Sequence, residues 1–173
     1  LMTRYPDLEW RMSPYEPAQA PQAATTDYTY RLDLSAGFEA VRRGWTRGHR
    51  GAARKARREG VQVALAQSAG EWAEYFDVYG DTLARWGADT RVWYRGALFD
   101  IMAARRSPHA KLWLARHDSQ VVAGLLCLYS TRVAVAWHDA VLAARFPLRP
   151  VHLLFHEAIR GAAEEGLQWF DFN

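Results

Sequence analysis

The hydrophobic positions of this chain change their period several times, and each change predicts a separate strand or helix. Apolar residues alternate with polar ones where strands are expected, and recur every three or four residues where helices are expected. On this basis we expect strands at 28–34, 61–65, 111–116, 121–129, 132–141 and 167–172, and helices at 42–58, 71–86, 95–106 and 150–166. The order predicts a mixed α/β domain in which three closely spaced strands form an antiparallel meander.

The first residues differ in composition from the rest. Residues 1–26 contain Pro6, Pro14, Pro17 and Pro21, which predicts a Pro-rich arm or linker before one domain at 27–173. The single cysteine, Cys127, lies in an apolar run, so we expect it to pack in the core rather than to form a disulfide. No apolar stretch approaches the roughly 18 residues of a membrane span and no signal peptide opens the chain, so we expect a cytoplasmic protein.

Positive charge is concentrated in one segment. Residues 42–58 contain eight arginines and lysines and no carboxylate, which exceeds the formal net charge of +3 for the whole chain. At helical spacing most of these side chains fall on one stripe, which favours binding to phosphates of a nucleic acid or a nucleotide-type ligand. The predicted phosphate or tRNA ligands are Arg43, Arg47, Arg50, Arg54, Lys55 and Arg58, with Arg57 as an alternative to Arg58 at the end of the stripe. A solvated surface helix is the other interpretation of this pattern.

Three segments resemble the FemAB-like branch of the GNAT acyltransferases. Residues 50–61, RGAARKARREGV, are similar to the pattern R-x-x-x-R-K-A-x-x-x-G-V of that branch. The other two are VAGL at 122–125 and PVHLLFHEAI at 150–159, continuing through Gly166 to FDF at 170–172. The order β-α-α-β-β-β-α-β from Val61 onward is also that of the GNAT core. The resemblance implies a GNAT-like fold preceded by a strand and a basic helix, and truncated at its C-terminal end.

The resemblance implies an enzyme that transfers an acyl or aminoacyl group to an amine of a cell-envelope precursor or polymer, such as peptidoglycan. The donor is then an acyl-CoA or an aminoacyl-tRNA. GNAT relatives bind the CoA pyrophosphate on backbone N–H groups of a Gly-rich turn before a helix. Here residues 145–150 read RFPLRP, and Leu148 and Pro150 replace the small residues. Because proline has no N–H and leucine hinders close approach, Arg145 and Arg149 are expected to hold phosphate by their side chains.

The resemblance also assigns site residues by position. Val122, Ala123 and Gly124, with the backbone around 136–140, are implied to line the donor or acceptor groove. The two strands that diverge in a GNAT-like sheet are implied to hold the acyl group between them, near His138, Asp139 and Asp171. A histidine or carboxylate there can take a proton from the amine, directly or through water. Ordinary strand-end hydrogen bonding is the alternative role of these residues.

Other catalytic patterns are weak or missing. His152 and His156 have a spacing that can bind zinc, but Glu157 lies outside the pair and the H-E-x-x-H pattern is not formed, so we expect no metal. No P-loop or dinucleotide fingerprint is present in the sequence, which favours direct transfer to the amine. The rival hypothesis is a non-catalytic module that binds nucleic acid or a partner through the 42–58 helix.

Overall fold

A computed structural model describes residues 28–87 and 94–173 of the 173-residue chain. The strands are β1 (Arg31–Asp33), β2 (Gln62–Leu65), β3 (Ala110–His117), β4 (Gln120–Tyr129), β5 (Val133–Val141) and β6 (Trp169–Asp171). The helices are α1 (Phe38–Gly44), α2 (Arg47–Arg58), α3 (Ala69–Trp86), α4 (Gly96–Arg105), the 3₁₀ helix η1 (Ala143–Leu148) and α5 (Pro150–Glu164). The predicted arm at 1–26 lies outside the described residues.

The six strands form one mixed sheet in the order β1-β6-β5-β4-β3-β2. Strands β3, β4 and β5 are the predicted antiparallel meander, and this prediction is confirmed. The β3–β4 turn places Asp118 and Ser119 at φ 50° and 63°, the conformation that a tight hairpin turn requires. Strand β6 then returns parallel to β5.

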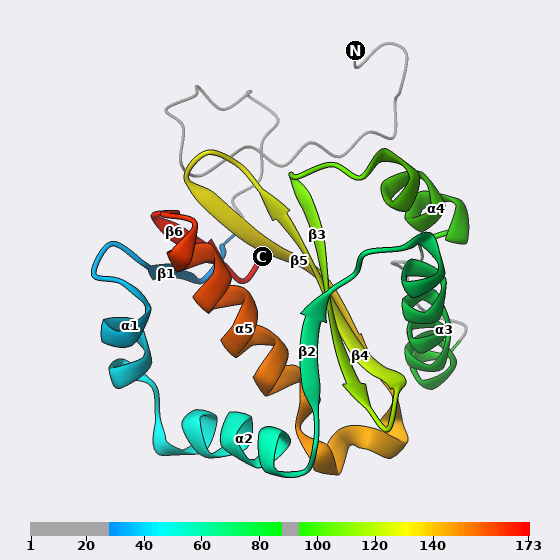
Figure 1. Ribbon diagram of the computed structural model, residues 1–173, viewed down its shortest axis with the longest axis horizontal. Helices are drawn as coiled ribbons and strands as arrows, with labels where there is room; N and C mark the ends of the chain where they lie inside the picture. Colours follow the sequence, from blue (N-terminus) through cyan, green and yellow to red (C-terminus); the bar gives the residue numbers. More distant parts are fainter. Residues whose placement is uncertain (1–27, 88–93) are drawn as a thin grey trace.

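Helices cover both faces of the sheet, with α3 and α4 on one side and α1, α2 and α5 on the other (Figure 1). On the first face, Tyr75, Tyr79 and Phe99 pack against β3 and β4. On the second, α5 packs its apolar stripe, with Leu154 at its centre, onto the sheet. Cys127 is fully buried in this second cluster, so its predicted core position is confirmed.

The prediction of one continuous helix over 42–58 is wrong. The segment forms two helices, because the chain leaves the first at Gly44 and is extended at Trp45, with φ −67° and ψ 146°. Trp45 packs edge-on against Phe38 and the His156 ring, 5.9 and 5.6 Å away between centroids. Thr46 then starts α2 by accepting a hydrogen bond from the His49 N–H at 3.3 Å, the role for which threonine is favoured. Most of the basic residues therefore lie on α2, and Arg43 lies on α1.

Candidate functional site

One edge of β5 is open over most of its length. Strand β6 pairs with β5 only along Val133–Val135, and no described strand pairs with the same edge of residues 136–141. On its other edge, Ala136 lies opposite Cys127 and His138 opposite Leu126, so Trp137 is the extra residue of a β-bulge. Bulges re-aim side chains and occur often beside active sites. This open stretch is where the predicted site residues His138 and Asp139 lie.

The bulge directs Trp137 and His138 to the same face, where both contact the aromatic side chains under α3 and α4. The ring centroids of Tyr79 and Tyr94 lie 4.5 and 5.4 Å from that of His138. The Tyr75 hydroxyl lies 2.6 Å from His138 Nδ1. Burial in these surroundings lowers the pKa of His138 to about 4, because a charged imidazole loses its hydration there. The ring is therefore neutral at physiological pH.

Asp139 lies on the other face of β5, opposite Leu125. Its side chain is exposed to solvent, yet the protein around it raises its pKa by desolvation. Its raised pKa makes this carboxylate a stronger base than an ordinary surface aspartate, and its exposure leaves it accessible to a ligand.

The structure does not bring Asp171 to this place. Asp171 lies on β6 opposite Val135, four residues before Asp139 along β5, or about 13 Å at the usual rise of a strand. It is 3% exposed, and its carboxylate accepts hydrogen bonds from the Thr29 hydroxyl and from the Asn173 N–H. These contacts correspond to the alternative role, strand-end hydrogen bonding.

The predicted groove residues of β4 lie beneath the site. Val122 and Ala123 are fully buried, and the strand around them pairs with β3 on one edge and β5 on the other. Gly124 is covered by Tyr75, because a Cβ atom at this position would overlap the Tyr75 ring. These three buried residues therefore support the site from below and do not line an exposed groove.

A hollow of about 460 Å³ lies between α2 and the start of α5. Its lining consists of Thr46, Gly48, His49, Gly51, Ala52, Lys55, Arg149 and His152, and we call it the α2–α5 groove. Lys55 and Arg149 were both predicted as phosphate ligands, whereas the two histidines were not. The ring centroids of His49 and His152 are 5.7 Å apart. The pKa of His152 is lowered by burial and then by the neighbouring His49 and Arg149, as expected among cationic groups.

The turn before α5 offers little backbone to an anion. The N–H of Arg145 donates to Leu142 and that of Arg149 to Phe146, at 2.9 and 3.0 Å, and Pro150 has no N–H. The N–H groups of Arg145 and Arg149 are therefore not available to the CoA pyrophosphate. The Arg145 side chain donates to Gln120 at 3.2 Å and does not line the α2–α5 groove, so Arg149 is the arginine of this turn that does.

The remaining arginines of α2 divide into two groups. Arg47, Arg54 and Arg58 are exposed, and no ion pair holds them among the described residues. Arg57 is also exposed, but it reaches α5 and pairs with Glu157. Arg50 donates to the Arg43 carbonyl at 2.9 Å and links the two basic helices. The exposed row thus continues the positive surface of the α2–α5 groove along α2.

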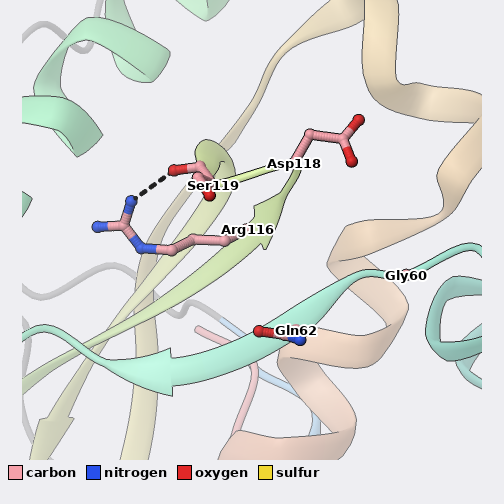
Figure 2. A pocket seen from close by; sticks show the side chains of 5 residues that line it. All are labelled: Gly60, Gln62, Arg116, Asp118 and Ser119. Atoms are coloured by element: carbon pink, nitrogen blue, oxygen red, sulfur yellow. Dashed lines mark hydrogen bonds between the residues drawn. The ribbon is translucent and has the colours of Figure 1, made fainter.

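A second hollow, of about 480 Å³, lies between the start of β2 and the β3–β4 turn (Figure 2). The Arg116 side chain in it donates to the Ser119 carbonyl at 3.1 Å. Glu71 and Glu74 also bind the same guanidinium, at 3.2 and 2.8 Å. Because its cation is already neutralised, this hollow is poorly suited to an anionic ligand.

Within residues 28–87 and 94–173, no cluster of three or more histidine, cysteine, aspartate or glutamate side chains is arranged to hold a metal ion. No helix in this part of the chain has the length and apolar character of a membrane span.

Comparison with solved structures identifies similar folds in larger proteins. FemX superposes with a TM-score of 0.72 and 12% identity, over 84% of this chain and 52% of that one. The C-terminal domain of an Agrobacterium fabrum protein assigned as a lysylphosphatidylglycerol synthetase superposes with a TM-score of 0.62 and 17% identity, over 84% of this chain and 45% of that one. L-PGS from Bacillus licheniformis superposes with a TM-score of 0.60 and 15% identity, over 83% of this chain and 43% of that one. The chain thus spans about half the length of these proteins or less, and the likeness is one of fold.

A search of curated proteins finds no match. The profile of the acetyltransferase (GNAT) domain matches residues 41–173, which is most of the chain. The predicted fold class and acyltransferase class are thereby confirmed. The chain belongs to the GNAT acetyltransferase domain family.

Proposed function

We propose that this domain transfers an aminoacyl group from an aminoacyl-tRNA to an amine of a cell-envelope precursor or polymer. The observation that carries the proposal is the α2–α5 groove with the exposed arginines that extend it. Lys55 and Arg149 offer side-chain cations to a phosphate in the groove. Helix α2 has 12 residues and is therefore about 18 Å long, enough to follow several phosphates of a nucleic acid backbone.

Acyl-CoA, the other donor that the family implies, fits this surface less well. Its pyrophosphate would meet a turn whose backbone N–H groups at Arg145 and Arg149 are already hydrogen-bonded. Side chains alone can still hold it, so acyl-CoA is the rival outcome of the experiment below. An aminoacyl-tRNA donor would place the reaction in the cytoplasm.

Asp139 is proposed to accept the proton of the attacking amine. It lies on the open stretch of β5, it is accessible to water and its pKa is raised. The amine nitrogen forms a bond to the carbonyl carbon of the aminoacyl ester, and the ester C–O bond then breaks. The proton that the amine loses passes through Asp139 or water to the leaving ribose oxygen. Transfer of an aminoacyl group draws support from the fold likeness to a protein assigned as a lysylphosphatidylglycerol synthetase.

The test is equilibrium binding of labelled tRNA to the full chain over a salt series, with acetyl-CoA as competitor. We expect salt-sensitive binding that acetyl-CoA does not displace. Replacing Lys55 and Arg149 together by alanine should weaken binding and reduce the slope of log K against log salt by about one to two, since each lost phosphate contact removes about 0.7–0.9. Arg132→Ala is the matched control, because Arg132 is exposed and binds Gln168 away from the groove.

Two results would contradict the donor assignment. One is tRNA binding that responds equally to the double variant and to Arg132→Ala, which would indicate general charge attraction. The other is displacement of tRNA by acetyl-CoA together with acetyl transfer, which would make acyl-CoA the donor.

A further inference from the structure

The Tyr75 hydroxyl is a buried donor that faces one histidine. Tyr75 lies on α3 and is fully buried. Burial, and next the charge of Asp139, raise the pKa of this hydroxyl well above its usual value, so it keeps its proton. Two acceptors lie near it, His138 Nδ1 at 2.6 Å and the His138 carbonyl oxygen at 3.4 Å. A phenol has one proton to donate, and the nearer acceptor is much the better placed.

The second acceptor indicates which partner donates. If His138 Nδ1 carried the proton, the Tyr75 hydroxyl could donate only to the His138 carbonyl oxygen at 3.4 Å, a poor hydrogen bond. We therefore assign the 2.6 Å contact as donation from the Tyr75 hydroxyl to Nδ1. A neutral imidazole that accepts at Nδ1 carries its proton on Nε2. No described residue is hydrogen-bonded to His138 Nε2, and the side chain is partly exposed, so this N–H is available to a ligand.

We infer that His138 donates a hydrogen bond from Nε2 to the carbonyl oxygen of the group being transferred, and that Tyr75 is the positioning residue that fixes this tautomer. The inference rests on the proposed function and replaces the role of base that the sequence suggested for His138. A neutral imidazole is a weak base, but it can stabilise negative charge that develops on a carbonyl oxygen.

Packing holds this arrangement in place. The Tyr75 ring lies directly over Gly124 on β4, where no other residue type leaves room for it. Around the imidazole, Tyr79 and Phe99 lie 4.5 and 5.7 Å away between ring centroids. No carboxylate or cation is among the ring contacts of His138 in the described residues, and Asp139 lies on the opposite face of the strand. The imidazole thus has Tyr75 as the partner that distinguishes its two nitrogens.

In the reaction His138 neither gains nor loses a proton. As the amine nitrogen bonds to the carbonyl carbon, the carbonyl π electrons move to oxygen, and His138 Nε2–H donates to that oxygen. When the intermediate collapses, the double bond re-forms and the ester C–O bond breaks. The amine proton leaves by way of Asp139 or water, as proposed above.

Nuclear magnetic resonance of the ¹⁵N-labelled full chain tests the tautomer without any substrate. We expect the wild-type His138 ring to be protonated at Nε2 and not at Nδ1. Tyr75→Phe keeps the ring over Gly124 and removes the hydroxyl, so a mixture of both tautomers should appear. Tyr129→Phe is the matched control: Tyr129 is also buried on the sheet, and its hydroxyl accepts from Trp113 Nε1 at 3.2 Å, away from His138. Protonation at Nδ1 in the wild type would overturn the inference.

Kinetics with charged tRNA or acetyl-CoA as donor and lysine amide as acceptor test the role. His138→Ala should lower kcat by roughly 10²–10³-fold, the loss typical of one oxyanion donor. The fall in rate at low pH, the acid limb of the pH profile, should remain because it reports protonation of the proposed base Asp139. His138→Gln, which keeps an N–H donor, should retain part of that activity, and Tyr75→Phe should lose about five-fold in kcat with little change in KM. If His138→Ala removes the acid limb, His138 is the base and the inference fails. If neither donor is turned over by the wild type, the proposed function fails and the role of His138 in transfer fails with it, whereas the tautomer measurement still tests the Tyr75–His138 contact.

Discussion

Glu157 on α5 is a buried carboxylate that ties the basic helix α2 to the core of the domain. It pairs with Arg57 of α2 and with Arg160 one turn further along α5, and His156 Nδ1 lies 3.2 Å from it. Burial alone would raise its pKa. Hydrogen bonds from His156 and Arg57 and the charge of Arg160 outweigh that effect and lower the pKa to about 2, from an ordinary value of 4.5. We therefore predict that Glu157→Gln destabilises the fold.

The magnitude follows from the pKa. A tenfold change in an acid constant corresponds to about 1.36 kcal/mol, so the change from 4.5 to about 2 sets an upper limit of about 3.4 kcal/mol. The side chains of Arg57 and Arg160 are 49% and 48% exposed, and water screens their attraction for Glu157. We accordingly expect Glu157→Gln to lower the free energy of unfolding by about 1–2 kcal/mol at pH 7.

The sign of the pH dependence is fixed because the pKa is lower in the folded state. The stabilisation is complete above about pH 4.5, where the unfolded chain is also ionised, and it is lost as the pH falls toward 2. The measurement is urea unfolding of wild type and Glu157→Gln, followed by tryptophan fluorescence. The difference in their free energies of unfolding should be less than half as large at about pH 3 as at pH 7. Glu164→Gln is the control, because Glu164 faces the same Arg160 at 3.8 Å but is 64% exposed. Equal stabilities at pH 7, or a difference in the free energy of unfolding that is unchanged at pH 3, would refute this reasoning.

Two further substitutions test the packing that supports the site. Gly124→Ala should lower the free energy of unfolding by about 1–3 kcal/mol, because the added Cβ would overlap Tyr75. Thermal unfolding measures this loss, and Gly80→Ala is the control because a Cβ at Gly80 meets open space. An unchanged melting temperature in Gly124→Ala would contradict the close contact. Ser68→Ala should cost about 1 kcal/mol in urea unfolding, since Ser68 and Glu71 form the capping box of α3. A loss confined to Glu71→Ala would show that the serine hydroxyl contributes little.

Local patterns were enough to predict most of the elements. The meander strands and the helices α3, α4 and α5 each carry a regular period, and their ends agree with the structure to within a few residues. The break at Trp45 was missed because the run of arginines dominates the segment. A threonine at position 46 after a glycine at 44 was a signal for a new helix start, since threonine is a favoured N-cap.

The candidate site depended more on long-range geometry. His138 and Asp139 are neighbours in the sequence, so their presence on one strand could be predicted. The position of Asp171 depends on the register of the parallel β5–β6 pair, which no local pattern predicts. Strand β6 pairs with the first residues of β5, and Asp171 is therefore far from Asp139. Tyr75 lies within the helix predicted at 71–86. Its hydroxyl contact with His138 joins residues 63 positions apart and has no signal in the sequence.

The two glycines of the α2–α5 groove, Gly48 and Gly51, restrict which stabilising substitutions the domain can accept without loss of ligand space. Alanine at either position would favour α2 by about 1 kcal/mol as a helix, and neither Gly48 nor Gly51 has a neighbour that a Cβ would overlap. Both glycines nevertheless line the groove, so each added methyl group would occupy part of the space offered to a ligand. Thermostability and ligand access are therefore opposed at these two positions, and a stabilised variant selected only for its melting temperature would be expected to narrow the groove.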